Sequence, residues 1–215
     1  MADRPILFSA PMIRALLAGT KTQTRRALKP QPVCHVGAVP SFSWGRYGGL
    51  YPDDWFGYGS EIDGALPYRP GDRLWVREAH ALVPASAYRM SDGVQQAINP
   101  SDRYEAAVYR CDWERSAPPW RPSIHMPRWA SRLTLTVTDV RVQRLQDISE
   151  EDAIAEGVAT FSEGRTMRSI SDAEIYRLLW EEINGAGSWD RNDWVAAYTF
   201  SVERRNIDAE ARHDL

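Results

Sequence analysis

The stretch ALLAGTKTQTRR, residues 15–26, joins an apolar run to a polar run through a single glycine. Upstream of it, apolar residues recur at helical spacing after Pro11, whose missing N–H costs nothing in the first turn of a helix. Gly19 stands where a helix that ends in a left-handed residue needs glycine. The sequence therefore predicts a helix over residues 11–18, a turn at Gly19 and a strand that begins within residues 22–26.

Alternation of apolar and polar residues predicts the remaining strands. It is clearest in RLTLTVTDVRV, residues 132–142, and after the Pro-Gly-Asp turn of RPGDRLWVRE, residues 69–78. Other strands are predicted at residues 5–8, 104–109 and 194–202. Ser149 and Ser171 each precede an acidic residue by three positions, which predicts the start of two more helices. The apolar stripe of the second helix is Ile175, Leu178, Leu179 and Ile183. Short strands interrupted by about three helices favour an α+β fold built on a small barrel.

Two segments interrupt this pattern within one domain, residues 1–203. Residues 28–70 are rich in proline, glycine and aromatic residues and show neither strand nor helix periodicity. A loop of this length is typically functional or disordered, and its aromatic residues favour an ordered lid over the cleft that Lys21 faces. These residues are Trp44, Tyr47, Tyr51, Trp55, Phe56 and Tyr58. Residues 82–101 form a second predicted insertion, and residues 204–215 a frayed acidic tail.

Composition limits the class of protein. The chain has 215 residues, of which 43% are hydrophobic and 26% charged, and it has no apolar run long enough to span a bilayer. Pro5 and Pro11 interrupt the short apolar stretch at the start, so we expect a cytoplasmic protein without a membrane partner. Cys34 and Cys111 lack metal-ligand spacing, as do the histidines, so we expect neither a metal nor a cofactor. The oligomeric state stays open.

Charge is distributed unevenly along the chain. Residues 1–46 carry seven basic residues against one acidic residue, whereas residues 133–193 carry six against thirteen. Arginine provides 24 of the 26 basic residues, which is compatible with phosphate recognition but is explained more simply by the codon bias of a genome. A net charge of −3 permits a nucleic-acid partner without requiring one.

Three motifs resemble those of ASCH-domain proteins, which belong to the PUA-like superfamily. The first is a G-x-K-T-x-T-x-R pattern, matched by Gly19, Lys21, Thr22, Thr24 and Arg26. PGDRLWV, residues 70–76, resembles the second motif, and LQDISEEDAIAEGV, residues 145–158, resembles the third. The resemblance is closest to a longer subgroup found in phage and prophage genomes. It implies a PUA-like, curved, mostly antiparallel β-barrel with about three flanking helices.

The resemblance also implies a catalytic site. Small relatives include an amidohydrolase that removes the acyl group from N4-acetylcytidine with a lysine, a threonine and a glutamate, which correspond here to Lys21, Thr24 and Glu156. A threonine hydroxyl needs a base, and a lysine can serve when burial lowers its pKa. Residues three apart on a strand point to opposite faces, so Lys21 and Thr24 act together only if Lys21 lies in the turn. Glu156 opposes its helix dipole, which either a site or a salt bridge to an arginine explains.

Further residues are predicted to bind the substrate. These are Thr22, Arg26, Trp75, Glu78, His125, Arg128 and Trp129. WRPSIHMPRWASR, residues 120–132, interleaves arginines with aromatics, which suits base stacking and phosphate contact, unless its tryptophans plug the end of the barrel. We expect a hydrolase acting on an N4-acylcytidine-type nucleoside, free or within nucleic acid, RNA rather than DNA. The alternatives are a ribonuclease and a non-catalytic nucleic-acid-binding module. In the module, the phosphate contacts are Lys21, Arg25, Arg26, Arg128 and Arg132.

Overall fold

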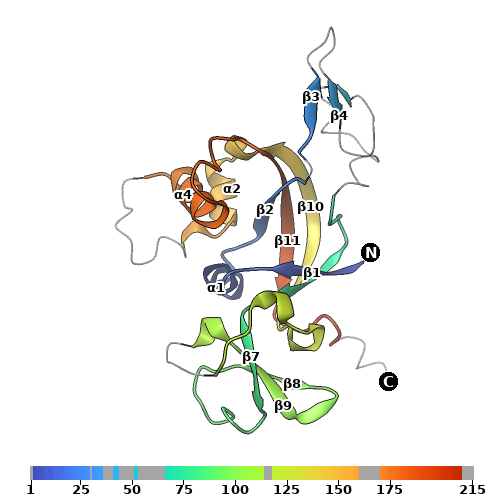
Figure 1. Cartoon of the computed structure of the whole chain (residues 1–215), viewed down its shortest axis with the longest axis vertical. Coiled ribbons are helices and arrows are strands. Elements are labelled where there is room, and N and C mark those ends of the chain that lie inside the picture. The colour runs from blue at the N-terminus through green and yellow to red at the C-terminus, as the bar shows by residue number, and fades with distance from the viewer. Residues whose placement is uncertain are drawn as a thin grey trace. The chain divides into compact units, whose positions relative to one another are not determined.

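The computed structural model describes seven segments of the chain. They are residues 2–29, 31–35, 41–43, 51–52, 66–113, 118–159 and 170–209. Within these segments the chain forms three α-helices and eleven strands, an α+β fold (Figure 1). It divides into two compact units, neither of them continuous in sequence. The first unit comprises Met1–Lys21, Gly71–Val137 and Phe200–Leu215, and the second comprises Thr22–Pro70 and Thr138–Thr199.

The largest sheet has five strands. They are β1 (Asp3–Leu7), β2 (Gln23–Ala27), β6 (Arg73–Arg77), β10 (Thr134–Arg144) and β11 (Trp194–Glu203), in the order β1-β6-β10-β11-β2. β10 pairs antiparallel with β6, and β11 pairs antiparallel with β2, as the sequence predicted for this sheet. β1 instead runs parallel to β6, with Asp3 opposite Arg73. The sheet is therefore mixed.

Helix α1 (Ala10–Ala18) belongs to the first unit and confirms the predicted helix and turn. Its buried face consists of Ile13, Ala15 and Leu16. Gly19 has φ = 77°, the left-handed conformation that only glycine adopts without strain, and its N–H donates to the last carbonyls of the helix. The cap ends the helix one turn before β2.

A three-stranded antiparallel sheet also belongs to the first unit. Its strands are β7 (His80–Pro84), β8 (Gln96–Asn99) and β9 (Asp102–Tyr109), in the order β7-β9-β8 (Figure 1). One cluster of buried side chains is Ala81, Val83, Ala106 and Val108, and another is Ala107, Tyr109, Met126 and Ala130. Within residues 82–101, residues 82–84 and 96–99 belong to strands of this sheet, and residues 85–95 connect them. β9 was predicted at residues 104–109, whereas β7 and β8 were not, because neither strand shows a regular alternation of buried and exposed residues.

The second unit holds helices α2 (Glu150–Ala155) and α4 (Asp172–Asn184), which pack against each other. Both predicted caps are present: the hydroxyls of Ser149 and Ser171 accept the N–H groups of Asp152 and Glu174 at 3.1 and 3.2 Å. The core includes Leu145, Ala153, Val158, Ile175, Tyr176, Leu179, Trp180 and Val195. The predicted stripe of α4 is wrong at its end, because Ile183 is 48% exposed. Tyr176 and Trp180, next to Ile175 and Leu179 on the helix surface, are buried in its place.

Residues 28–70 contain a further small sheet. Its strands are β3 (Val33–His35), β4 (Ser41–Ser43) and β5 (Tyr51–Pro52), paired antiparallel in that order. The composition of this segment predicted an irregular loop, whereas part of it forms strands. The aromatic side chains of the predicted lid lie outside the described residues, so the lid stays a prediction.

The tail after Arg204 is packed as far as Ala209, where the sequence predicted fraying. The side-chain amide of Asn206 donates to the carbonyls of Arg128, Trp129 and Ser131 at 2.9, 3.1 and 2.7 Å. Ile207 is buried beside it. Three hydrogen bonds and one buried side chain outweigh the entropy that frays most chain ends. Among the residues that the structure describes, no helix combines the length and apolar character needed to cross a bilayer.

Candidate functional site

Lys21 lies in the first unit with 0% of its surface exposed. Its N–H donates to the carbonyl of Ala15 at 3.2 Å, so Lys21 belongs to the turn after α1 and not to β2, which begins at Gln23. Its Nζ lies 5.7 Å from the centroid of the Phe8 ring. The turn placement meets the condition under which Lys21 and Thr24 can act together.

Thr24 lies in the second unit, in the middle of β2, and is 2% exposed. Its partner across the ladder is Tyr198 of β11, so these two side chains share one face of the sheet. Successive side chains of a strand alternate between faces, so Thr24 points away from Gln23 and Arg25.

Glu156 also lies in the second unit, at the C-cap of α2, and is 3% exposed. Nη1 of Arg25 donates to Oε1 of Glu156 at 3.2 Å, and Nη2 donates to Oδ2 of Asp152 at 2.6 Å. Burial by itself raises the pKa of Asp152, but the hydrogen bond from Arg141 and the charge of Arg25 bring it below its usual value. The salt-bridge interpretation of Glu156 is therefore confirmed, because Arg25 provides the compensating charge.

Sequence reasoning missed Arg25 as the centre of this network. One signal was available: Asp152 and Glu156 are four residues apart and share a helix face, and a lone arginine facing two carboxylates satisfies both. Lys21 thus belongs to the first unit, and Thr24 and Glu156 to the second, each of them buried. The convergence of the three stays a prediction.

The predicted substrate-binding residues occupy varied positions. Thr22 is exposed, and its N–H donates to the carbonyl of Ala155 at 2.8 Å. Arg26 is half-buried in β2. Trp75 is half-buried in β6, where the guanidinium of Arg77 lies 5.1 Å from the centroid of its ring. His125 is exposed at the end of a short 3₁₀ helix, Ser123–His125.

Arg128 and Trp129 follow in a second 3₁₀ helix, Arg128–Ala130, and have structural partners. Nη2 of Arg128 lies 2.5 Å from Oδ2 of Asp3 and 2.6 Å from Oδ1 of Asp208. Trp129 packs against the cluster that contains Tyr109 and Met126. These contacts favour the interpretation in which the tryptophans of this segment cover a core.

Glu78 is the centre of a buried polar cluster in the first unit, and it is 2% exposed. Nε and Nη2 of Arg132 donate to its two carboxylate oxygens at 2.9 and 3.0 Å. Arg132 also donates to both oxygens of Asp112, at 2.5 and 2.9 Å, and its guanidinium lies 3.9 Å from the centroid of the Tyr109 ring. The Cys111 thiol lies 3.2 Å from Glu78 and from Asp112. Arg132, predicted to contact phosphate in the binding-module alternative, is committed to these carboxylates.

The pKa of Glu78 lies above its ordinary value of 4.5, because burial disfavours the charged form more than Arg132 favours it. A carboxyl group with a raised pKa in the folded state contributes stability that is lost as the pH rises from 4.5 through the folded pKa. We therefore expect the free energy of unfolding of the native chain to fall relative to that of Glu78→Gln as the pH rises from about 4 to about 7.

Urea denaturation of both proteins across this pH range measures the difference. The control is Glu182→Gln, which replaces an exposed carboxylate on α4 and should track the native chain. If the native chain instead gains stability over Glu78→Gln as the pH rises, then Arg132, and not burial, sets the pKa of Glu78.

Comparison of the chain with protein-family models, curated proteins and solved structures finds no match in any of the three. The resemblance to ASCH-domain proteins therefore rests on the three sequence motifs. Within the described segments, no three histidine, cysteine, aspartate or glutamate side chains are grouped as metal ligands.

Proposed function

We propose that the protein is a PUA-like hydrolase of the ASCH type that removes the acyl group from a modified nucleoside. Lys21 acts as the base, Thr24 as the nucleophile or as the group that positions water, and Glu156 contacts the exocyclic nitrogen. The observation that supports this most is the complete burial of Lys21 in the turn of its motif. Full burial of a lysine is rare in proteins.

The sequence holds only one other lysine for comparison. Lys29, eight residues further along, is exposed. A lysine acts as a general base when its surroundings bring its pKa near the working pH, and removal from water is the usual means. Since none of its surface is exposed, a substrate reaches Lys21 only if the side chains that cover it move.

The proposed reaction adds water across an amide bond. Lys21 takes the proton of the Thr24 hydroxyl, or of a water molecule beside it, and the freed oxygen attacks the acyl carbon. The carbon–nitrogen bond breaks, and the proton passes to the departing exocyclic nitrogen, which releases the free base amine. When water attacks, the acyl group leaves directly as a carboxylic acid. When Thr24 attacks, the acyl group is held as a threonine ester, which a water molecule then hydrolyses to the carboxylic acid and the free Thr24 hydroxyl. Nη1 of Arg25 lies 3.2 Å from Oε1 of Glu156 and favours the ionised carboxylate. An ionised Glu156 can accept a hydrogen bond from the exocyclic N–H.

A substrate screen tests this function. We expect the purified chain to release cytidine from N4-acetylcytidine, measured by chromatography, and to act more slowly on N6-acetyladenosine. Turnover should change little between about 50 and 200 mM salt, because a nucleoside has no phosphates from which to release counterions. No turnover, together with RNA binding that weakens steeply with salt, would support the binding module instead. Cleavage of end-labelled RNA would support the ribonuclease.

A further inference from the structure

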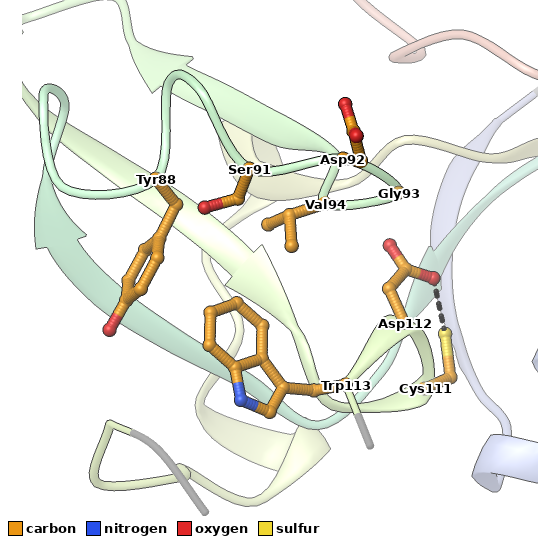
Figure 2. Close-up of a pocket in the computed structure, with 8 residues that line it drawn as sticks. All are labelled: Tyr88, Ser91, Asp92, Gly93, Val94, Cys111, Asp112 and Trp113. Atoms are coloured by element: carbon orange, nitrogen blue, oxygen red, sulfur yellow. Dashed lines mark hydrogen bonds between the residues drawn. The ribbon is translucent and has the colours of Figure 1, made fainter. Parts of the chain in front are cut away.

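A pocket of about 710 Å³ lies in the first unit, apart from the residues proposed to be catalytic. Its lining residues come from the segment between β7 and β8 and from the short 3₁₀ helix that follows β9, Arg110–Asp112, with Trp113 at its end (Figure 2). They are Tyr88, Ser91, Asp92, Gly93, Val94, Cys111, Asp112 and Trp113. This volume falls within the range of pockets that hold small molecules, roughly 300 to 1,000 Å³.

Two aromatic rings form a corner of this pocket. The rings of Tyr88 and Trp113 meet edge to face, with centroids 4.6 Å apart and an interplanar angle of 83°. The ring of Trp120 packs against that of Trp113, with their centroids 5.9 Å apart. Figure 2 shows Tyr88 and Trp113 on one side, with Ser91 and Val94 facing them. Two perpendicular rings can surround a compact ligand group on two sides. A planar nucleobase would instead need rings parallel to it on which to stack.

The charges around the pocket are mainly negative. Asp92 and Asp112 line it, and no lysine, arginine or histidine is among its lining residues as the structure describes them. Behind Asp112 lies Arg132, whose single positive charge is shared with Glu78. A second guanidinium, that of Arg110, donates to the carbonyl of Trp113 at 3.4 Å. Three carboxylates therefore stand against two guanidinium groups. Burial raises the pKa of the Cys111 thiol well above its usual value, so the thiol adds no charge at neutral pH.

We propose that this pocket binds an organic cation, an ammonium group carried on a small apolar body. The faces of Trp and Tyr attract a cation through the quadrupoles of their rings, and a carboxylate strengthens the attraction. Val94 contacts the apolar body, and the Ser91 hydroxyl, which Figure 2 shows directed inward, accepts a hydrogen bond from a primary or secondary ammonium. The proposal does not depend on the hydrolase function, because Lys21, Thr24 and Glu156 are not among the residues that line the pocket.

Calorimetric titration of the full chain with choline tests the proposal. The matched probe is 3,3-dimethylbutan-1-ol, which has the shape of choline without its charge. We expect choline to bind at least about tenfold more tightly than the alcohol, the ratio that a desolvated cation–π contact of about 1.4 kcal/mol gives. Equal affinities, or binding of cytidine in place of choline, would overturn the proposal, as would the absence of heat at millimolar choline.

Variants assign the binding to this pocket. Trp113→Leu should weaken choline binding about tenfold, and Asp92→Asn by a smaller factor that shrinks with added salt. Tyr88→Leu tests the same corner if Trp113→Leu does not fold. The control is Tyr104→Leu, which removes an exposed ring of β9 outside the pocket and should leave the affinity unchanged. Full affinity in both Trp113→Leu and Tyr88→Leu would place the cation elsewhere and refute the assignment.

Discussion

Lys21→Met is expected to lower kcat on the acylated nucleoside by about 10² to 10⁴-fold, the usual contribution of a general base. Methionine keeps much of the apolar volume of the lysine stem and brings no charge into the buried turn. We therefore expect the melting temperature to change by no more than about 3 °C. Chromatographic assay of product release gives kcat, and calorimetry gives the melting temperature.

Lys29→Met is the matched control, because it removes the other lysine from an exposed position and should keep full activity. Because the chain has only two lysines, the native chain and the two variants also allow the lysine side chains to be titrated individually. Reductive methylation with ¹³C-formaldehyde labels the lysines, and the exposed Lys29 should react before the buried Lys21. Full activity in Lys21→Met would remove Lys21 as the base. A large loss of stability together with activity would indicate that Lys21 holds the fold and does not catalyse.

Arg132→Leu is expected to lower the free energy of unfolding by about 3 to 5 kcal/mol, the cost of leaving buried charges without their partner. The substitution removes the donors to Glu78 and Asp112 and leaves the Glu78 carboxylate, with almost none of its surface in water, uncompensated. The loss should shrink as the pH falls, since the pKa of Glu78 is already raised by burial and a neutral carboxyl needs no cation. Urea denaturation at several pH values measures it.

The control for this substitution is Arg103→Leu in β9. Arg103 is exposed and lies over the ring of Tyr104 at 4.9 Å, so its loss should cost less than about 1 kcal/mol. The double variant Arg132→Leu with Glu78→Leu should recover part of the stability, because it removes one of the stranded carboxylates. A loss at Arg132 no larger than that at Arg103 would mean that water or backbone groups satisfy Glu78 without it.

Local sequence patterns predicted those elements of the fold that depend on near neighbours. The Gly19 cap, the serine caps at Ser149 and Ser171, and the longest strand, β10, all follow from residues within one or two turns. The parallel pairing of β1 with β6 does not, because it joins Asp3 to Arg73 across 70 residues, as their side-chain hydrogen bond shows. Local alternation carries no information on such partners.

The candidate site was less predictable than the fold. The burial of Lys21, Thr24 and Glu156 agrees with a site, but burial alone does not tell a catalytic group from a paired one. Arg25 and Arg132 were expected at phosphates, yet each faces two carboxylates within the fold. The sequence does not tell whether the partner of an arginine is a bound phosphate or a distant carboxylate, because the oxygens of both groups accept hydrogen bonds from the planar guanidinium.

The order of synthesis gives the packed tail a kinetic meaning. The amide of Asn206 donates to the carbonyls of Arg128, Trp129 and Ser131, and these residues leave the ribosome 75 to 78 positions ahead of it. At typical elongation rates that interval is on the order of ten seconds, far longer than the collapse of a small chain. Until Asn206 emerges, the carbonyls of Arg128, Trp129 and Ser131 lack the hydrogen bonds from its amide, so this packing of the tail forms only after the rest of the segment has been made.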